Sequence, residues 1–452
     1  MNDLTRGNEY RTLLFFGMPI LIGNLFQQLY NVVDGVVVGR FLGAENLAAV
    51  GFGFLIGFLL TSLSMGLTLG SGILVSRCCG AGKPEKIGTI VDTGIWFSVL
   101  LGIAVTAAGV EFSPGIVRMF NVPAESAGFA ACYLRILFAG CLPLFLYNTL
   151  TNLLRGLGDS KGPVFLLTGG VLLNAGLDLL CIAHWKTGIA GAAYATVVSQ
   201  IAVCAGTFLY LRFRYPAIGV RFRLDFGILR ESLRIGIPAM TQQLFLCVGF
   251  MAIQGMVDRF GSDCMASFAI TSKIDAFAQL PVLNLGQALS NFIAQNLAAN
   301  RPDRVERGVR AAMALAVATA LAVSLLVLPV PELILRLFIR DGAVLAIGCG
   351  YLRIVGIFYC VNAVMQILNG FLLGCGRAFV PMISTVGSLC LLQVPVAWLL
   401  SSTFLGCTGI WLATPCGWIG GVLIRWFYCR KTRLAFQRPD PAAAHGVTGF
   451  PV

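Results

Sequence analysis

Long apolar segments separated by short polar breaks follow one another along almost the whole chain. Each segment has about 20 residues, which is the length an α-helix needs to cross roughly 30 Å of hydrocarbon. The breaks leave no room for a soluble domain. The pattern therefore predicts twelve membrane-spanning helices, which we place at residues 12–38, 48–77, 90–110, 132–155, 163–184, 188–211, 232–256, 267–297, 311–331, 345–372, 380–402 and 407–428.

The composition agrees with this pattern. Hydrophobic residues make up 57% of the chain and charged residues only 12%, whereas soluble domains are about one quarter charged. We therefore expect an all-α integral membrane protein.

Short sequences that occur twice divide the chain into two halves. The tetrapeptide Tyr-Leu-Arg-Ile at 133–136 reappears at 351–354, and the same offset aligns Lys-Pro-Glu-Lys at 83–86 with Arg-Pro-Asp-Arg at 301–304. A parallel duplication of this kind is a transporter architecture with the substrate site between the halves. We predict a six-helix lobe at 1–215, a cytoplasmic linker at 216–231, a homologous six-helix lobe at 232–438 and a disordered tail at 439–452. Because both lobes keep Tyr-Leu-Arg-Ile, we interpret it as a determinant of the fold.

The net charge of +12 is a signal of topology. Most of the 32 lysines and arginines fall in the breaks on one side of the predicted membrane, and basic residues favour the cytoplasmic side. We expect a multi-pass protein of the plasma (inner) membrane with both termini in the cytoplasm and without a cleavable signal peptide. Membrane lipid is an expected partner of the basic surface, and nucleic acid is not.

Polar residues inside the first lobe's helices lie on shared helical faces. Asn24, Gln27, Asn31 and Asp34 in the first helix are three or four residues apart, and residues at this spacing are neighbours on a helix. Polar groups at membrane depth are costly and are candidates for function. This stripe must face protein or a water-filled cavity.

The fifth and sixth helices add further oxygen ligands. At 1.5 Å per residue, Asp178 lies about 22 Å from the cytoplasmic start of the fifth helix, and Thr196 lies about 12 Å from the outer end of the sixth. With Asp34 and Asn174, they are hard oxygen ligands suited to a small cation, either Na⁺ or a proton. The alternative is that each aspartate caps or pairs locally for structural reasons.

The duplication predicts that cation binding belongs to the first lobe alone, because Val396 stands at the position that corresponds to Asp178. Other polar residues within helices are candidates for a substrate cavity, although they could equally pair across helices for structural reasons. They are Asn24, Gln27, Asn31, Lys273, Asp275, Gln279, Asn362, Gln366 and Asn369.

Several chemical functions are excluded. The fifteen cysteines are scattered without a Cys-x-x-Cys pair, so we expect small buried thiols. Two histidines cannot complete a zinc set, and Gly-Ala-Gly-Lys-Pro-Glu at 80–85 lacks the spacing of a phosphate-binding loop. We expect no enzyme activity, no cofactor and no metal other than a transported Na⁺.

Three sequences resemble the multidrug and toxic compound extrusion (MATE) family: GMPILIGNLFQQLYNVVDGVVVGRFLGAENLAAVG from residue 17, RGLGDSKGP from residue 155 and QNLAANRPDRV from residue 295. The resemblance covers roughly residues 10–430. It implies an antiporter that expels mostly cationic, amphipathic compounds in exchange for Na⁺ or H⁺. The family's first-lobe cation site matches Asp34, Asn174, Asp178 and Thr196 residue by residue.

We therefore expect a monomeric secondary active efflux antiporter that exports cationic or amphipathic small molecules by alternating access, in exchange for H⁺ or Na⁺. The alternative is a flippase or exporter of lipid-linked or polysaccharide cargo from the same wider superfamily. That alternative predicts a basic cavity for anionic headgroups, whereas the intramembrane groups lean towards acids and amides.

Overall fold

The computed structural model describes residues 3–120, 122, 124–218, 221 and 223–437, without the side chains of residues 29–50, 54, 124, 125, 183 and 432–437. The predicted tail at 439–452 and the side chains of Asn31 and Asp34 lie outside this description. In the described residues the chain is almost entirely helical, as the sequence predicts.

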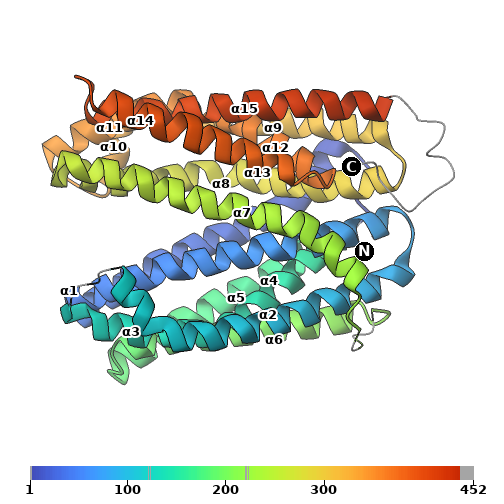
Figure 1. The fold of residues 1–452 in the computed structure, drawn as a ribbon, viewed down its shortest axis with the longest axis horizontal. Coiled ribbons are helices and arrows are strands. Elements are labelled where there is room, and N and C mark those ends of the chain that lie inside the picture. The colour runs from blue at the N-terminus through green and yellow to red at the C-terminus, as the bar shows by residue number, and fades with distance from the viewer. Residues whose placement is uncertain (1–2, 121, 123, 219–220, 222, 438–452) are drawn as a thin grey trace.

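The first lobe begins with α1 (Glu9–Gly80), a helix of 72 residues. A straight helix of this length would measure about 108 Å, far more than the membrane requires. Figure 1 shows that α1 instead runs to the opposite end of the molecule and folds back, so that its two limbs supply two spans. The lobe continues with α2 (Pro84–Met119), α3 (Ala124–Ala139), α4 (Cys141–Gly156), α5 (Lys161–Asp178), the π-helical turn η1 (Leu179–His184) and α6 (Ile189–Arg214).

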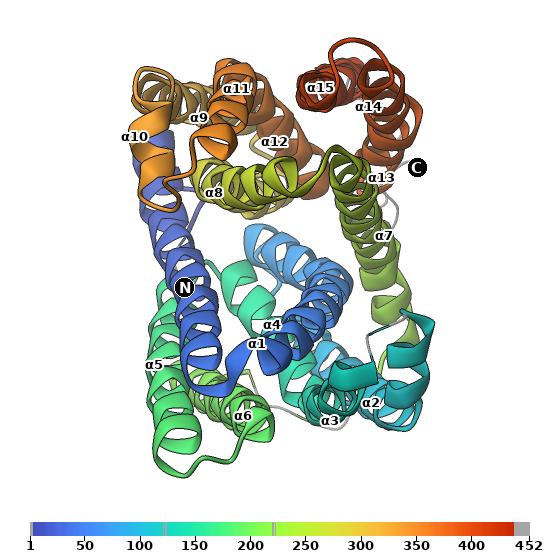
Figure 2. The same ribbon diagram turned by 90° about the vertical axis from the view of Figure 1, so that its left-hand side faces the viewer.

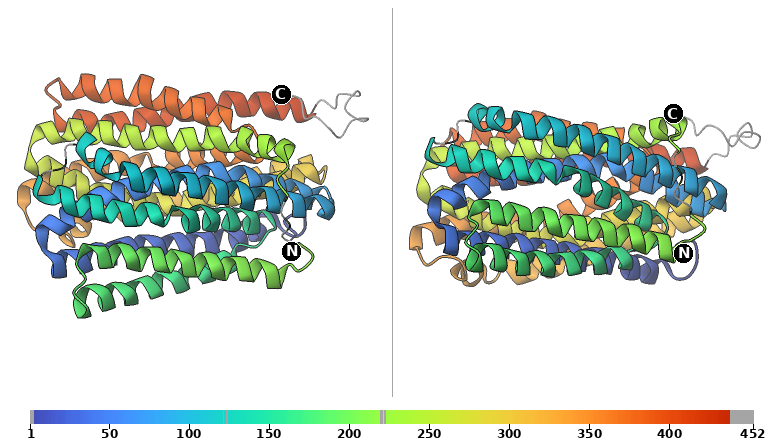
Figure 3. Two further views of the ribbon diagram at one scale, coloured as in Figure 1. Left: turned by 60° about the horizontal axis from the view of Figure 1, so that its bottom comes forward. Right: turned by 90° about the horizontal axis from the view of Figure 1, so that it is seen from below.

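The second lobe starts at α7 (Phe226–Val257), inside the predicted linker, because Asp225 caps the helix by accepting a hydrogen bond from the Ile228 amide. The remaining elements are η2 (Asp258–Phe260), α8 (Ser262–Ala298), α9 (Pro302–Val327), α10 (Pro331–Arg336), α11 (Gly342–Ile357), α12 (Tyr359–Gly374), α13 (Phe379–Val386), the π-helical turn η3 (Gly387–Gln393), α14 (Val394–Ser401) and α15 (Cys407–Gln437). Figure 3 shows the spanning helices running along the long axis of the molecule.

Within the described residues, eight helices are long and apolar enough to cross a membrane, and two bent helix pairs raise the number to ten. The first limb of α1 and the helix α8 complete the twelve predicted spans. Both carry amide side chains at helical spacing, which lowers their hydropathy. These two spans also pack against each other, since Asn24 of α1 donates a hydrogen bond to Asn284 of α8 (2.5 Å).

The repeated sequences form the same local structures in both lobes. Pro84 and Pro302 each occupy the first turn of a helix, where proline is tolerated because that amide has no helical partner. The pairs α3–α4 and α11–α12 bend by 45° and 51° at equivalent places. Gly158 and Gly376 both have positive φ values, +81° and +77°, which glycine adopts without steric cost. The duplication thus repeats the fold as well as the sequence.

α1 begins and α15 ends at the same end of the molecule, which we call the terminal end; the opposite end is the far end (Figure 1). The two lobes meet towards the terminal end. Ser71 and Ser232 are hydrogen-bonded at 2.9 Å, and Ser76 donates to Asn291 at 3.0 Å. Gly66 lies directly against the backbone of Met240 in α7, where a Cβ atom would clash. Small residues of this kind allow close packing of membrane helices.

The segment before α1 is docked in the second lobe. Gln295 accepts a hydrogen bond from the backbone amide of Leu4 (3.1 Å), and Leu4 itself is buried. The Arg304 guanidinium donates to the carbonyl oxygens of Gly7 (2.6 Å) and Arg6 (2.8 Å), and to the Glu9 carboxylate (3.2 Å). The first lobe is therefore tied to the second by its own N-terminal segment.

One prediction about the cysteines is wrong. Cys264 at the start of α8 and Cys407 at the start of α15 form a disulfide across 143 residues, although we expected only small buried thiols. Neither sequence spacing nor a Cys-x-x-Cys pattern marks this pair, because only the folding of α8 against α15 brings the two residues together at the far end.

Candidate cation and substrate sites

The first-lobe candidates on the fifth predicted helix lie together at the end of α5. Asn174 and Asp178 are one helical turn apart and almost fully buried, with 3% and 0% of their surface exposed. Immediately after Asp178 the helix widens into the π-helical turn η1. Such turns in α-helices are frequent at functional sites. The backbone is therefore irregular where the sequence predicts a cation ligand.

Thr196 of α6 comes level with this part of α5. α5 touches α6 where Gly170 lies against Val203, and the following turn η1 touches α6 where Gly191 lies against Cys181. Thr196 falls between these two contacts, as Asn174 and Asp178 do on the opposite helix. It is half-buried, and its hydroxyl donates to the Ala192 carbonyl at 3.1 Å. The structure thus brings three of the four predicted cation ligands to one level.

The amide of Asn174 has unused hydrogen-bonding capacity. Neither its nitrogen nor its oxygen has a hydrogen-bond partner among the described residues. A buried polar group left without a partner costs about 1–3 kcal/mol, so an unpaired group in a native fold calls for an explanation such as an ion or a water. A cation bound by the amide oxygen would supply that partner.

In the first helix, the described candidates are Asn24 and Gln27. Asn24 reaches across to Asn284 of the second lobe, as described above, and Gln27 is exposed. The side chains of Asn31 and Asp34 lie outside the described residues, so their roles remain predictions. Where the cysteines, histidines and acids are described, no three of them gather as metal ligands.

Asp275, by contrast, is enclosed by hydrogen-bond donors inside the second lobe. Its carboxylate accepts from the Tyr359 hydroxyl (2.5 Å), the Tyr351 hydroxyl (2.8 Å) and the Gln279 amide (3.2 Å). The Asn362 amide in turn donates to Gln279 at 3.0 Å. Three of the predicted cavity residues therefore form one network that joins α8 to α12.

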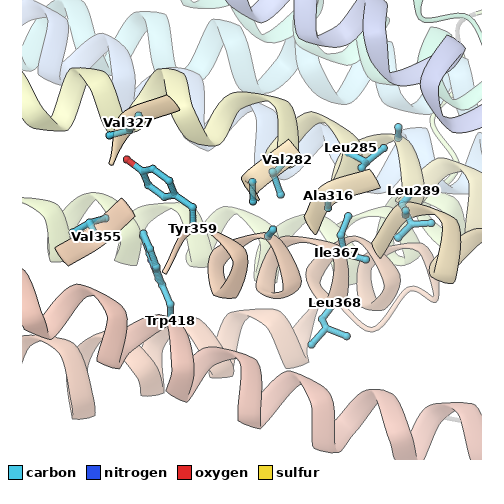
Figure 4. Close-up of a cluster of buried hydrophobic side chains, with 14 of the residues drawn as sticks. Val282, Leu285, Leu289, Ala316, Val327, Val355, Tyr359, Ile367, Leu368 and Trp418 are labelled. Carbon is cyan, nitrogen blue, oxygen red and sulfur yellow. The ribbon is translucent and has the colours of Figure 1, made fainter. Parts of the chain in front are cut away.

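Aromatic packing holds the two tyrosines of this network in place. Tyr351 meets Trp411 edge to face, with ring centroids 5.0 Å apart, and Tyr359 lies 6.4 Å from Trp418. Figure 4 shows Tyr359 and Trp418 among the buried apolar side chains of the second lobe. Because the surrounding core fixes both rings, Asp275 belongs to the interior of this lobe.

The other predicted cavity residues of the second lobe lie apart from that network. Gln366 and Asn369 are half-buried on α12, and Asn369 accepts a 3.4 Å hydrogen bond from Gln242 of α7. Lys273 is exposed. It lies about three helical turns before Asn284 on α8, and hence on the helix face that carries Asn284 towards the first lobe.

Two groups of residues were missed by reasoning from the sequence. Tyr351 was assigned to the fold without its hydrogen bond to Asp275, and Tyr359 was not singled out. The second group is a polar stripe on α8 that contacts the first lobe, and its spacing of three or four residues is the signal that could have revealed it. The missed residues of the stripe are Asn284, Asn291 and Gln295, which lie on the same face as Gln287.

Comparison with known proteins identifies the family. The MatE family model matches residues 19–180 and again residues 238–399, so that one match lies in each lobe. The probable multidrug resistance protein YoeA of Bacillus subtilis is 31% identical over 435 residues, covering 94% of both chains. The multidrug export protein MepA of Staphylococcus aureus is 22% identical, covering 89% of both.

Solved structures have the same fold. An outward-facing conformation of a multidrug resistance MATE family transporter matches with a TM-score of 0.89 and 23% identity, covering 97% of this chain and 99% of that one. A MOP superfamily transporter from Pyrococcus furiosus, described by the reversed polarity of its binding pocket, also has a TM-score of 0.89, with 23% identity and coverage of 96% and 98%. The matches of the family model to both lobes, together with the 31% identity to YoeA, show that the chain belongs to the MATE family of membrane transporters and is not an enzyme.

Proposed function

We propose that the protein is a secondary active antiporter that expels amphipathic, mostly cationic small molecules in exchange for Na⁺ or H⁺. Membership of the MATE family and the names of its relatives support multidrug efflux. The observation that carries ion coupling is the buried pair at the end of α5, where the Asn174 amide, beside Asp178, has no hydrogen-bond partner among the residues whose side chains are described. Asp34 and Thr196 complete the proposed cation site.

The way in which the lobes meet supports alternating access. Hydrogen bonds and close helix contacts join them towards the terminal end, so a transport cycle has to break these contacts and form others at the far end. A cation that binds one conformation more tightly shifts the equilibrium towards it by its difference in affinity. Inward movement of one charge supplies about 2.3 kcal/mol per 100 mV.

Transport in proteoliposomes tests the proposal. Na⁺ and pH gradients are imposed separately, and movement of a fluorescent organic cation against its own gradient is recorded. We expect one gradient to drive transport, and Asp34→Asn to abolish it while leaving a folded protein, because an amide replaces an acid in a stripe that is already rich in amides. Driven transport by purified Asp34→Asn at the wild-type rate would remove the proposed role of the first-lobe site.

The exposed Lys273 favours a second candidate function, the export or flipping of lipid-linked or polysaccharide cargo with an anionic headgroup. A basic group on the α8 face that points towards the first lobe could pair with such a headgroup. The same vesicles distinguish the two candidates: a flippase would move a labelled anionic lipid between leaflets and would leave the organic cation where it is.

A further inference from the structure

A groove of about 860 Å³ opens at the far end of the second lobe, between α10 and α11. One face of α11 forms its floor with small residues, among them Gly342, Ala346 and Gly350. Three arginines and one glutamate surround this floor: Arg336, Arg340, Arg353 and Glu332. The groove therefore combines room for a ligand with a concentration of basic side chains.

The groove carries uncompensated positive charge. Glu332 pairs with Arg336 across 2.6 Å, whereas Arg340 and Arg353 have no ion-pair partner in the part of the chain that the structure describes. Arg353 lies about three turns inside α11, and a long arginine side chain can extend from such a depth towards the membrane surface. Guanidinium groups bind phosphate oxygens in pairs, so the groove suits an anionic, phosphate-bearing ligand.

The surroundings of the groove are apolar and face outward. Leu333 and Leu337 on and after α10 are 64% and 79% exposed, and Phe338 is 57% exposed. Figure 2 shows α10 at the edge of the molecule when it is viewed from the far end. In a membrane protein, exposed apolar side chains at the perimeter contact lipid. A ligand at this position therefore meets charge at one end and hydrocarbon at the other.

The duplicated Tyr-Leu-Arg-Ile motif supplies an independent observation. Its tyrosine and leucine are buried in both lobes, which explains their retention by packing. The arginine is exposed in both lobes, as Arg135 and Arg353, so packing does not explain it. The same offset aligns Arg118 with Arg336, whereas Val122 stands where the second lobe has Arg340. An exposed arginine pair is thus repeated, and the second lobe adds a third arginine.

From these observations we propose that the groove between α10 and α11 binds the headgroup of an anionic phospholipid from the leaflet at the far end. Arg340 and Arg353 hold the phosphate oxygens, and the acyl chains lie against Leu333, Leu337 and Phe338. The groove lies on elements that pack within the second lobe, so this lipid is a fixed partner of the protein and not its transported cargo.

Lipid retention by the purified full-length protein tests this proposal. The wild type and the Arg340→Gln/Arg353→Gln variant are titrated with phosphatidylglycerol, phosphatidylcholine or inorganic phosphate, and bound lipid is counted by native mass spectrometry. We expect the wild type to prefer phosphatidylglycerol, and the variant to lose affinity for it on the order of tenfold, since each basic residue near anionic lipid contributes about 1 kcal/mol. Inorganic phosphate should compete only weakly.

The matched control removes the same charge from the same end of the first lobe. Arg118→Gln/Arg135→Gln should change retention of phosphatidylglycerol by less than about twofold, because Val122 stands there at the position of Arg340, so the arginine pair that holds the phosphate has no counterpart in that lobe. Equal losses in the two double variants would overturn the assignment to the groove. An anionic phospholipid would be overturned as the ligand if phosphatidylcholine bound as tightly as phosphatidylglycerol. The same would follow if inorganic phosphate displaced the bound phosphatidylglycerol completely.

Discussion

Asp178 and Asp275 are both buried acids in spanning helices, but their surroundings differ. Asp275 accepts three hydrogen bonds from the second lobe's own side chains, and an aromatic core holds two of the donors. Beside Asp178, the described residues offer the buried amide of Asn174 no hydrogen-bond partner, and a π-helical turn comes next in the chain. Burial of an acid is therefore insufficient evidence of a ligand site. Neighbouring side chains with unused hydrogen-bonding groups are more informative.

The duplication makes this comparison a controlled one. In the second lobe, the π-helical turn η3 comes earlier along the corresponding helix, and Val396 of α14 stands where the first lobe has Asp178. The second lobe kept the scaffold but has an apolar residue at this position. The sequence interpretation of unequal lobes remains a prediction, and identical substitutions in the two lobes can test it.

The largest expected difference is between Asp178→Asn and Asp275→Asn. Asp178→Asn removes a charge from the proposed cation site, and loss of a charge about 4 Å from a cation weakens binding on the order of a hundredfold or more. Ion-driven efflux in proteoliposomes should therefore nearly vanish. Asp275→Asn should leave transport per folded molecule within about threefold of the wild type, because the network around Asp275 is structural.

Both variants are compared at sub-saturating ion gradients, after gel filtration has established that they are folded. The reverse pattern, a dead Asp275→Asn beside an active Asp178→Asn, would move the ion site to the second lobe and reduce Asp178 to a structural role.

A second test concerns stability. Tyr351→Phe and Tyr359→Phe each delete one hydroxyl that donates to the Asp275 carboxylate, while the ring and its packing remain. Each should lower the free energy of unfolding by about 1–2 kcal/mol, as expected for a buried hydrogen bond within a membrane protein. Thermal unfolding in detergent measures this. Tyr194→Phe, at a tyrosine of α6 whose side chain is 56% exposed, is the control and should have a smaller effect.

Periodicity and duplication predicted the architecture well, because both depend on local sequence. Apolar length located the spans, and the repeats at 83–86 and 301–304 start helices in the same way in both lobes. Asn174, Asp178 and Thr196 lie at one level in the structure, since depth along a helix follows from counting residues, and their role as cation ligands stays a prediction.

Long-range pairing could not be predicted in the same way. Whether Asp275 faces a cavity or two tyrosines depends on how α8 meets α11 and α12, and no local pattern encodes that contact. The Cys264–Cys407 disulfide and the docking of the segment before α1 depend on tertiary packing as well. The sequence therefore showed which side chains are anomalous, but not which partner satisfies each of them.

Thr196→Ala should have a smaller effect than Asp178→Asn and thereby sharpen the distinction between charged and neutral ligands. A hydroxyl contributes about 1 kcal/mol to holding a cation, so the apparent affinity for the driving ion should fall about fivefold while the maximal rate is retained. Transport measured across a series of Na⁺ or H⁺ concentrations separates these parameters. Thr196→Ser, which keeps the oxygen, is the control and should resemble the wild type. A loss of transport as severe as that of Asp178→Asn would show that the carboxylate is not the principal ligand.

The smallest expected effect concerns the segment that ties the first lobe to the second. The Glu9 carboxylate accepts a hydrogen bond from Arg307 (2.8 Å), and this bond, with the charges of Arg304 and Arg307, holds the pKa of Glu9 below its ordinary value of 4.5. A lowered pKa in the folded state means that the stabilisation is fully present above pH 4.5 and is lost as the pH falls through the folded-state pKa. Glu9→Gln should therefore lower the melting temperature by about 1–2 °C at pH 7.

The difference in melting temperature between Glu9→Gln and the wild type should be unchanged at pH 5 and should shrink as the pH falls below 4.5. Because only Glu9 differs between the two proteins, titration of other carboxyl groups cancels in this comparison. A difference that persists undiminished at the lowest pH would mean that the interaction at Glu9 does not depend on its charge.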